Sequence, residues 1–413
     1  MSDAEHGQHP LHVMVVADQY YPPTLGGSAI SARRLAAGLA SRGHRVTVLA
    51  PSTGFQDYVE FDQGTTVLRR RSLPALHLWK HTDRHQIRAA LFPDSFVTRA
   101  IRVLSPQIVH IQVPALMGAA AVRVARELDI PVVATLHALP ENVVPTRDKG
   151  SLLFRAVSAL FWEEVISFCD RCDVVTAPSH TACRLLEEHG LRRRAIPTSN
   201  GVDTTIFRPP RDPAEKLGAR RRLGLPLDPP LVLYAGRLAA EKRLDVLVEA
   251  MARVLQERRA HLVLAGSGST EIEQLAHALG IGHAVTFTGR INDDLFPLVY
   301  RAADIFALPS EAELQGIVLL EAAASGLPLV GARVYAIPEI VQHGVNGLLH
   351  QPGDADDLAQ CLGYLIDHSA VRQHMGERGR ALAAQHSLPN LLVQWERLYR
   401  QALEAREALA AVR

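Results

Sequence analysis

The chain of 413 residues is 47% hydrophobic and 21% charged, which is typical of a soluble globular protein that is too long for one core. No apolar stretch approaches the ~20 residues of a membrane-spanning helix, and the N-terminus lacks the basic and apolar regions of a signal peptide. We therefore expect a cytoplasmic protein with two domains.

The formal net charge of +1 is unevenly spread, with +3 in residues 1–205 and −2 in residues 206–413. The imbalance is sharpest in the basic segment, residues 67–102, where two aspartates accompany eight cations. These cations are Arg69, Arg70, Arg71, Lys80, Arg84, Arg88, Arg99 and Arg102. Such a cluster favours an anionic membrane surface or a phosphorylated acceptor, and a solvated basic face is the alternative.

The first half of the chain alternates predicted strands with predicted helices. Residues 12–18 form a continuous apolar run, as in strands of parallel sheets that are buried on both faces. Residues 29–43 have helical spacing, and this helix is predicted to end at Gly43. Further strands are predicted at 44–51, 107–114, 130–138 and 172–179.

The pattern restarts after residues 200–213, a segment rich in turn formers and prolines that we predict to be a linker. Strands are then predicted at 230–237, 260–268, 284–289, 304–310 and 327–332. The alternation indicates an α/β fold with two Rossmann-like doubly wound domains, residues 1–205 and 206–387, facing each other across a cleft. The final helix, 388–413, carries an apolar stripe and is predicted to complete the first domain.

Two pairs of residues have the spacing of metal ligands, and we assign neither to a metal. Cys169 and Cys172 lack a second pair to complete a zinc site, and the strand after them favours the end of a packed helix. His81 and His85 have helical spacing but lack the glutamate of the zincin pattern.

Two positions in the predicted cleft suit a phosphate group. Gly26 and Gly27 lie between a strand and a helix, where backbone amides and the helix terminus favour an anion; a plain tight turn is the alternative. Arg237 ends a strand and Lys242 begins the next helix, so two cations converge in a way that suits a diphosphate. A surface ion pair with Glu241 is the alternative for these cations.

Two glutamates with seven residues between them, Glu313 and Glu321, stand in "PSEAELQGIVLLEAAASGLPLV". Glu313 precedes a predicted helix at the cleft, whereas Glu321 lies on the helix among apolar residues, where a carboxylate without a partner is costly. The amides of Leu314, Gln315 and Gly316 are predicted to point from the helix start toward an anion or a hydroxyl. The two acids could hold a sugar and a ribose, or one could merely cap the helix.

The ordered set of motifs resembles glycosyltransferase family 4, the retaining glycosyltransferases of the GT-B fold that carry an E-x7-E motif. The resemblance covers nearly the whole chain and includes "PPTLGGSAIS", "ASRGHRVTVLAP", "VVATLHA", "SNGVDTTIF", "YAGRLAAEKRLDVLVEA", "LVLAGSG", "FTGRI" and "LPSEAELQGIVLLEAAASGLPLV". It implies a retaining enzyme that moves a hexose from a nucleotide-diphosphate sugar, with a UDP-sugar favoured, to an acceptor hydroxyl.

The resemblance also implies a role for each candidate residue. Arg237 and Lys242 match the pair that binds the donor diphosphate. Glu321 matches the acid that holds the nucleotide ribose, and Glu313 matches the acid that contacts the hydroxyls of the donor sugar. Gly27 matches a loop glycine of the first domain that lies near the phosphates.

His137, in "TLHA", matches a histidine beside the transferred sugar, and a satisfied core histidine is the alternative. Members of the family need no metal, because arginine, lysine and helix dipoles stabilise the departing diphosphate. Retention is explained there by attack from the same face, with the departing phosphate assisting removal of the acceptor proton. We therefore assign no cofactor, no metal and no general base from the protein.

The acceptor is indicated only indirectly. Gln315 and Gly316 replace the aromatic-glycine pair usual after the first acid, and this variant, with the basic segment, resembles members that glycosylate membrane lipids such as diacylglycerol. Residues 150–168 could form an apolar helix that touches a bilayer at the inner face of the membrane, or an ordinary packed helix. Soluble sugar, polysaccharide and natural-product acceptors stay open, as do, more distantly, a 2-epimerase and a non-catalytic nucleotide-sugar-binding protein. No nucleic-acid partner is expected.

Overall fold

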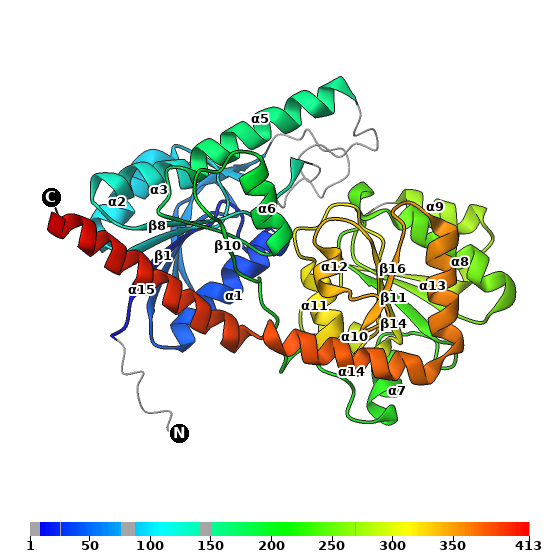
Figure 1. Ribbon diagram of the computed structural model, residues 1–413. Helices are drawn as coiled ribbons and strands as arrows, with labels where there is room; N and C mark the ends of the chain where they lie inside the picture. Colours follow the sequence, from blue (N-terminus) through cyan, green and yellow to red (C-terminus); the bar gives the residue numbers. More distant parts are fainter. Residues whose placement is uncertain (1–8, 25, 76–86, 141–150, 269, 413) are drawn as a thin grey trace.

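The computed structural model describes residues 9–24, 26–75, 87–140, 151–268 and 270–412. Two α/β units lie side by side, and each is built around a largely parallel sheet that helices cover on both faces (Figure 1). The predicted fold class, two Rossmann-like doubly wound domains, is confirmed. Every strand predicted from the sequence is present, and most of these strands, such as β1 and β11, are apolar runs that are buried on both faces of their sheet.

The first sheet has the strand order β10-β9-β8-β7-β1-β2-β4-β3. Its strands are β1 (His12–Val16), β2 (Arg45–Pro51), β3 (Tyr58–Asp62), β4 (Thr65–Arg70), β7 (Ile108–Ile111), β8 (Val132–Thr135), β9 (Val174–Ala177) and β10 (Ile196–Pro197). All are parallel except the edge strand β3. The strand order reverses between β1 and β7, and the carboxyl ends of the strands at such a point are where α/β proteins bind ligands.

Helices α1 (Gly27–Ser41) and α15 (Leu388–Val412) cover one face of this sheet. The other face packs against α2 (Pro93–Leu104), α3 (Leu116–Glu127), α5 (Leu152–Cys169) and α6 (His180–Glu188). Strands β5 (Ser72–Pro74) and β6 (Arg88–Ala90) form a separate antiparallel pair.

The second sheet is entirely parallel, with the order β13-β12-β11-β14-β15-β16. Its strands are β11 (Leu231–Ala235), β12 (His261–Ala265), β13 (Val285–Gly289), β14 (Ile305–Leu308), β15 (Leu329–Ala332) and β16 (Gly347–His350). The helices around it are α7 (Pro213–Arg222), η1 (Ala240–Lys242), α8 (Leu244–Glu257), α9 (Thr270–Ala278), η2 (Gly282–Ala284), α10 (Phe296–Ala302), α11 (Ile317–Ala324), α12 (Ile337–Ile340), α13 (Ala355–Asp367) and α14 (Ser369–Gln385). Here the order reverses between β11 and β14.

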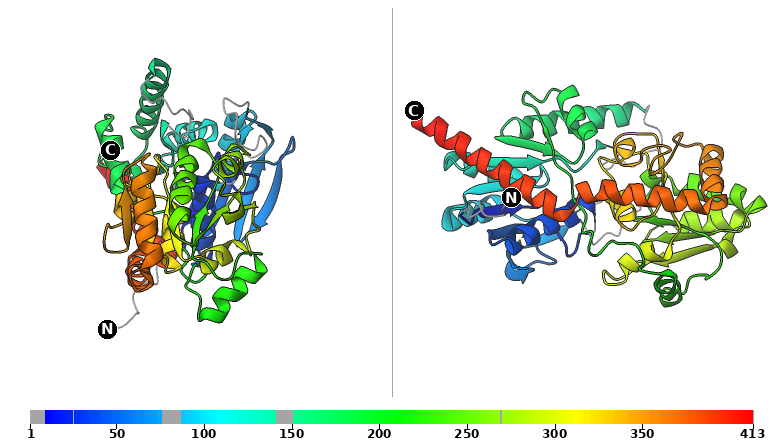
Figure 2. Two further views of the ribbon diagram at one scale, coloured as in Figure 1. Left: turned by 90° about the vertical axis from the view of Figure 1, so that its right-hand side faces the viewer. Right: turned by 60° about the horizontal axis from the view of Figure 1, so that its bottom comes forward.

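The chain passes between the domains twice, along adjacent paths. Val202 on the way out pairs with the return segment through hydrogen bonds with His386 and Leu388, both 2.9 Å long. Helix α15 then runs back beneath the first domain (Figures 1 and 2). Its buried side chains join the core formed by β1, β2 and α1. These side chains are Leu391, Leu392, Trp395, Leu398, Tyr399 and Ala402.

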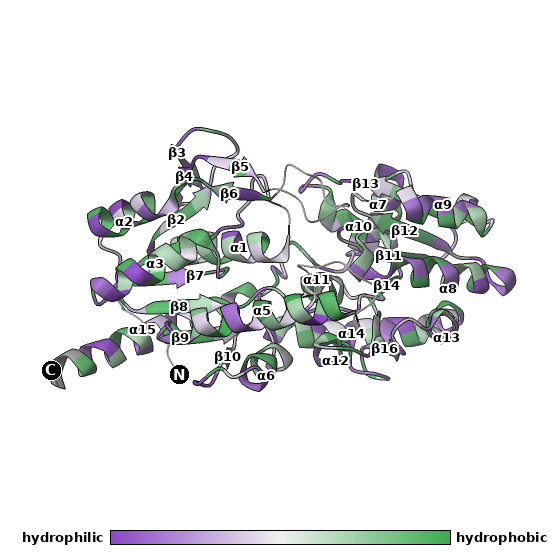
Figure 3. Cartoon of the chain, turned by 90° about the horizontal axis from the view of Figure 1, so that it is seen from above, coloured by the Kyte–Doolittle hydropathy of each residue, from purple (hydrophilic) through white to green (hydrophobic). Residues whose placement is uncertain are grey.

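Helix α5 is partly packed and partly exposed. Trp162 and Phe168 are buried in the core of the first domain, and Phe154 is buried as well, so the interpretation of residues 150–168 as a packed helix holds for this side. Leu152 and Leu153, at the start of the helix, are 82% and 71% exposed. Hydrophobic residues thus run along α5 on more than its buried side (Figure 3). Within the described ranges, no helix combines the length and the hydropathy that crossing a bilayer requires.

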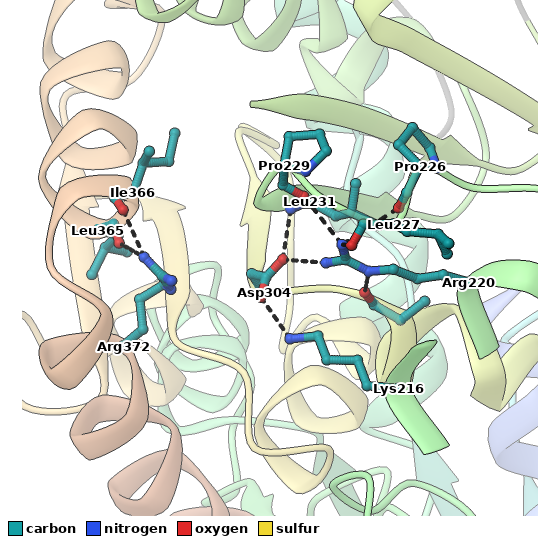
Figure 4. A network of polar contacts seen from close by, with 11 residues as sticks. Lys216, Arg220, Pro226, Leu227, Pro229, Leu231, Asp304, Leu365, Ile366 and Arg372 are labelled. Atoms are coloured by element: carbon teal, nitrogen blue, oxygen red, sulfur yellow. Dashed lines mark hydrogen bonds and ion pairs between the residues drawn. The ribbon is translucent and has the colours of Figure 1, made fainter. Parts of the chain in front are cut away.

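A largely buried carboxylate, that of Asp304, fastens the start of the second domain. Asp304 accepts hydrogen bonds from Lys216 Nζ at 2.5 Å and Arg220 Nη2 at 2.6 Å on α7, and from the amide of Leu231 at 2.7 Å (Figure 4). Nearby, the Arg372 guanidinium donates to carbonyl oxygens at the C-terminal end of α13 (Figure 4). The Asp304 contacts hold α7 against the sheet whose strand ends carry the candidate site, and the Arg372 contacts hold α14 against α13.

The interpretation of the basic segment is wrong for Arg69 and Arg70, because both side chains are buried. Arg69 donates to Glu60 Oε1 at 2.8 Å and to two backbone carbonyls. Arg70 pairs with Asp57 at 2.6 Å. These guanidiniums bind the β3–β4 hairpin to neighbouring backbone carbonyls and face neither a membrane nor solvent. Lys80 and Arg84 lie outside the described residues, as do His81 and His85.

Candidate active site

The candidate site lies at the carboxyl ends of β11 and β14, the neighbouring strands at which the order of the second sheet reverses. Lys242 follows β11 and Glu313 follows β14. Lys242 Nζ donates a hydrogen bond to Glu313 Oε1 at 2.6 Å, and both side chains are largely buried. A cation and an acid that the sequence assigned to one cleft are therefore in contact, although 71 positions separate them.

Arg237 emerges from the same end of β11. Its Nη2 atom donates to Glu241 Oε1 at 2.8 Å, so the local ion pair that the sequence left open is present. The Arg237 side chain stays 37% exposed, and a guanidinium has five N–H donors, more than this one carboxylate oxygen uses. The Tyr234 hydroxyl donates to the Arg237 carbonyl oxygen at 2.6 Å and fixes the backbone where the chain leaves the strand.

Two helix N-termini from opposite domains meet at the site. Gly26 precedes α1 and Gly316 precedes α11. Gly316 has a φ of +78°, which glycine adopts at little cost, and this turn starts α11 directly after the loop that carries Glu313. A Cβ added to Gly27 would lie 3.4 Å from the side chain of Ile317 in the first turn of α11. The partial positive charges of both helix starts therefore act on the same space.

The side chains of Leu314 and Gln315 turn away from this space toward the first domain. Leu314 packs into the core of that domain. Gln315 Nε2 donates to Ser199 Oγ at 2.9 Å, while Gln315 Oε1 accepts from the Asn200 amide at 2.8 Å. Gln315 thus ties the loop to the start of the interdomain linker.

Glu321 is 3% exposed, and its carboxylate has two partners that the sequence did not indicate. Arg34 on α1 donates to Glu321 Oε1 at 2.6 Å, and the Tyr300 hydroxyl on α10 donates to Oε2 at 2.9 Å. Burial and the neighbouring Glu321 carboxylate raise the pKa of Tyr300 well above its usual value, so this hydroxyl remains a donor. The buried acid signalled that a counter-charge was needed, but nothing local pointed to a residue 287 positions away.

His137 lies just beyond β8, where it is half-buried. Its Nε2 atom is 2.7 Å from Gln112 Oε1. Burial lowers the pKa of His137 to about 4, so the imidazole is neutral near pH 7. The histidine therefore has the satisfied hydrogen bond expected of a core residue and the strand-end position expected of a site residue.

Cys169 and Cys172 are buried free thiols at the end of α5, as predicted. Burial raises the pKa of Cys169 to about 12. In the part of the chain that the structure describes, no three His, Cys, Asp or Glu side chains gather as a metal site would require.

Comparisons with known proteins show which family the chain belongs to. The model of Glycosyltransferase Family 4 matches residues 25–206, and that of Glycosyl transferases group 1 matches residues 216–382. A D-inositol 3-phosphate glycosyltransferase of Thermobifida fusca is 30% identical over 86% of this chain and 83% of its own length. The chain belongs to the group 1 glycosyltransferases. The glycosyltransferase is therefore an enzyme that transfers sugars, and its predicted family is confirmed at this level.

Two further proteins bear on what the glycosyltransferase resembles. An alpha-monoglucosyldiacylglycerol synthase of Streptococcus pneumoniae is 28% identical over 88% of this chain and 80% of its own length. HepE of Anabaena, solved in complex with UDP and glucose, superposes with a TM-score of 0.75 over 94% of this chain and 100% of its own, at 19% identity. The glycosyltransferase thus has the GT-B fold.

Proposed function

We propose that this glycosyltransferase moves a hexose from a nucleotide-diphosphate sugar, with a UDP-sugar favoured, to an acceptor hydroxyl with retention of configuration. The contact between Lys242 and Glu313, beside Arg237 and two helix N-termini, carries the proposal. A diphosphate needs fixed positive charge, and a sugar needs acceptors for its hydroxyl hydrogens. The presence of UDP and glucose in HepE supports a donor of this class.

In the proposed reaction, Arg237, Lys242 and the start of α11 stabilise the negative charge that develops on the departing diphosphate. Glu313 accepts hydrogen bonds from the sugar hydroxyls, and Glu321 accepts them from the ribose. The bond from the anomeric carbon to the diphosphate oxygen breaks while the acceptor oxygen bonds to the same face. The acceptor proton passes to the departing phosphate, so the reaction needs neither a protein base nor a metal ion. Neutral His137 lies beside the transferred sugar.

We further propose a membrane lipid such as diacylglycerol as the acceptor, approached by peripheral contact with a bilayer. The name of the Streptococcus pneumoniae relative supports a lipid substrate. The exposed leucines along the first half of α5 support an apolar contact, since Leu152, Leu153 and Leu160 are each at least 65% exposed. The buried Arg69 and Arg70 have no part in this proposal.

The proposal is tested by transfer of radiolabelled sugar from UDP-glucose to diacylglycerol in vesicles, after a thermal-shift screen of UDP-, GDP- and ADP-sugars. Arg237→Ala and Lys242→Ala are each expected to lower turnover by ~100-fold, since each removes one preorganised donor to the diphosphate. Arg253→Ala is the matched control, because this cation on α8 pairs with Asp356 at 2.6 Å and not with a residue of the site.

Full turnover by both alanine variants would remove the donor site from Arg237 and Lys242. Turnover should also persist in EDTA, and a loss that added Mg²⁺ or Mn²⁺ restores would contradict the metal-free reaction. Label that enters only soluble saccharides would replace the lipid with a soluble acceptor. Inversion at the anomeric carbon of the product would exclude the retaining mechanism.

A further inference from the structure

Arg34 connects the first domain to the acid buried in the second. Its Nη2 atom lies 2.6 Å from Glu321 Oε1, and its Nη1 atom lies 3.4 Å from the carbonyl oxygen of Gly201 in the linker. The Arg34 side chain is 19% exposed, against 3% for Glu321. The guanidinium therefore sits where the chain passes between the domains, with its charge against the candidate ribose acid.

The guanidinium is also held from its flat side. Its central carbon lies 5.7 Å from the ring centroid of Phe207, and the Phe207 ring meets the Tyr300 ring edge-on at 5.4 Å. Tyr300 in turn donates to Glu321 Oε2. Arg34, Phe207, Tyr300 and Glu321 thus form a closed cluster in which each side chain limits the orientation of the next.

A buried carboxylate needs both hydrogen bonds and a compensating charge. Tyr300 supplies Glu321 with a hydrogen bond but no positive charge. Arg34 supplies the charge, and does so only while the first domain lies against the second. The electrostatic balance of Glu321 is therefore linked to the arrangement of the two domains.

The Arg34 and Tyr300 side chains do not use the whole hydrogen-bonding capacity of the Glu321 carboxylate. A carboxylate offers roughly four lone-pair positions, and Arg34 and Tyr300 donate to one oxygen each. The remaining positions can accept vicinal hydroxyls, provided that the carboxylate is held with a fixed orientation.

We propose that Arg34 is a positioning residue of the donor site: it holds the Glu321 carboxylate for the ribose hydroxyls and so couples nucleotide binding to the closed arrangement of the domains. The inference rests on the proposed function, because it takes Glu321 as the ribose acid. Such coupling is reciprocal. A nucleotide that needs the oriented carboxylate favours the arrangement in which Arg34 reaches it.

The same helix offers a matched control. Arg33, the preceding residue, pairs with Asp62 through contacts of 2.7 and 2.8 Å. Asp62 belongs to β3, so this ion pair stays within the first domain. Arg33→Gln therefore removes an arginine and an ion pair from α1 without touching the interface with α11.

The test is a double-mutant cycle on nucleotide affinity. Binding of UDP, GDP and ADP to the wild type is measured by calorimetry, and the tightest nucleotide is used for Arg34→Gln, Glu321→Gln, the double variant and Arg33→Gln. We expect Arg34→Gln to weaken binding by at least about tenfold, within the usual range of coupling between sites. The double variant should bind no more weakly than the weaker single variant. Arg33→Gln should bind like the wild type.

Kinetics gives a second readout. In the transfer assay, Arg34→Gln should raise the donor KM far more than it lowers kcat, because the lost interaction orients the nucleotide and not the reacting carbon. A variant that is merely less stable would show a lower Tm with unchanged nucleotide affinity, and that result overturns the inference. Additive losses from Arg34→Gln and Glu321→Gln also overturn it.

Two further outcomes keep the inference separate from the proposed function. A wild type that binds none of the three nucleotides overturns both together. A wild type that binds while Arg34→Gln binds equally well overturns only the inference. If Arg34→Gln does not fold, Arg34→Lys replaces it, since lysine keeps the charge but loses the planar fork. Measurably weaker nucleotide binding by Arg34→Lys supports the role of Arg34, and wild-type affinity contradicts it.

Discussion

At the scale of single residues, a buried polar chain lies behind the candidate site. His110 Nδ1 is 2.7 Å from the Tyr399 hydroxyl of α15, and His110 Nε2 is 2.8 Å from Thr135 Oγ1. Gln112 links this ring to His137. The orientation of His137 therefore depends on Gln112 and His110, which lie behind it. In an apolar interior, His110 must stay uncharged.

His110 should make stability depend on pH. Burial lowers the pKa of His110 to about 3 from 6.5, so below pH 6.5 the unfolded chain binds a proton that the folded chain excludes. The stabilisation is complete above about pH 6.5 and is lost as the pH falls toward 3. Between pH 7.5 and 5.0 this loss is about 2 kcal/mol. Urea unfolding at both pH values should show a pH dependence smaller by this amount in His110→Gln than in the wild type.

Asp18 acts in the opposite direction. Burial raises the pKa of Asp18 to about 6, so its carboxyl favours the folded state as the pH falls through 6. This contribution is common to the wild type and to His110→Gln, and it cancels when their pH dependences are subtracted. Equal pH dependences of the two proteins would show that His110 is not the buried neutral group.

At the scale of elements, close helix packing holds α11, and with it Glu321, in place. Helix α14 crosses the C-terminal end of α11 so closely that a Cβ on Gly376 would overlap the carbonyl oxygen of Gly326. Gly326 itself has a φ of +77° in the turn that ends α11. The atoms nearest to the added Cβ belong to the backbone of Gly326, so no flexible side chain can move aside to make room for it.

Gly376→Ala should therefore destabilise the protein by about 1–3 kcal/mol, the usual cost of overpacking, or more. Gly218 on α7 is the control, since a Cβ there meets nothing within 4 Å. Gly218→Ala should be neutral or stabilising by up to ~1 kcal/mol, because alanine is the better helix former. Urea unfolding of both variants tests this expectation: the midpoint of Gly376→Ala should be the lower one, and similar midpoints would contradict the packing argument.

The strands that the sequence predicted are mostly continuous runs of apolar residues. Strand β7 is apolar at most positions and buried on both faces, so its pattern is visible without tertiary information. The sequence did not predict β3, β4, β5, β6, β10 or β16, of which β5, β6 and β10 are only two or three residues long. Strand β3 alternates exposed and half-buried residues, and β4 ends in Arg69 and Arg70. Two adjacent arginines are typical of a protein surface. Their burial is explained only by the fold of the hairpin and its neighbours, which brings Glu60 to Arg69 and Asp57 to Arg70.

The candidate site likewise contains residues that the sequence could predict and residues that it could not. Glu313 and Lys242 were predictable, since each follows a recognisable strand and strand ends at a switch point share one edge. Arg34 and Tyr300 were not, because their role depends on how α1 and α10 lie against α11. A sequence shows that the Glu321 carboxylate needs a partner, and only the packing of helices shows which residue supplies it.

At the scale of the whole molecule, the two domains are joined by more than the linker. Glu339 on α12 accepts hydrogen bonds from the amides of His180 and Thr181 at 3.0 and 2.7 Å, so an acid of the second domain caps α6 of the first. Together with the Arg34–Glu321 pair and the contacts of Gln315 with Ser199 and Asn200, this contact joins the two domains. A rotation of one domain would have to exchange these contacts for contacts with water or ligand.

The first domain also depends on residues that follow the second in the chain. Trp395 on α15 is 3% exposed, and its ring lies 4.5 Å from that of His110 on β7. Trp395→Ala should cost about 3–5 kcal/mol, the usual range for a buried aromatic side chain. Val393, on the same helix but 40% exposed, provides the control, and Val393→Ala should be nearly neutral.

The location of the damage distinguishes this expectation from general destabilisation. In Trp395→Ala, hydrogen exchange should speed up at the amides of β1 and β7, because the core they share with α15 loses its largest side chain. The amides of β11 and β12 belong to a separate core and should keep their protection. Equal loss in both sheets would mean that the domains unfold as one cooperative unit. Loss confined to β11 and β12 would mean that α15 stabilises the domain it leaves rather than the domain it reaches.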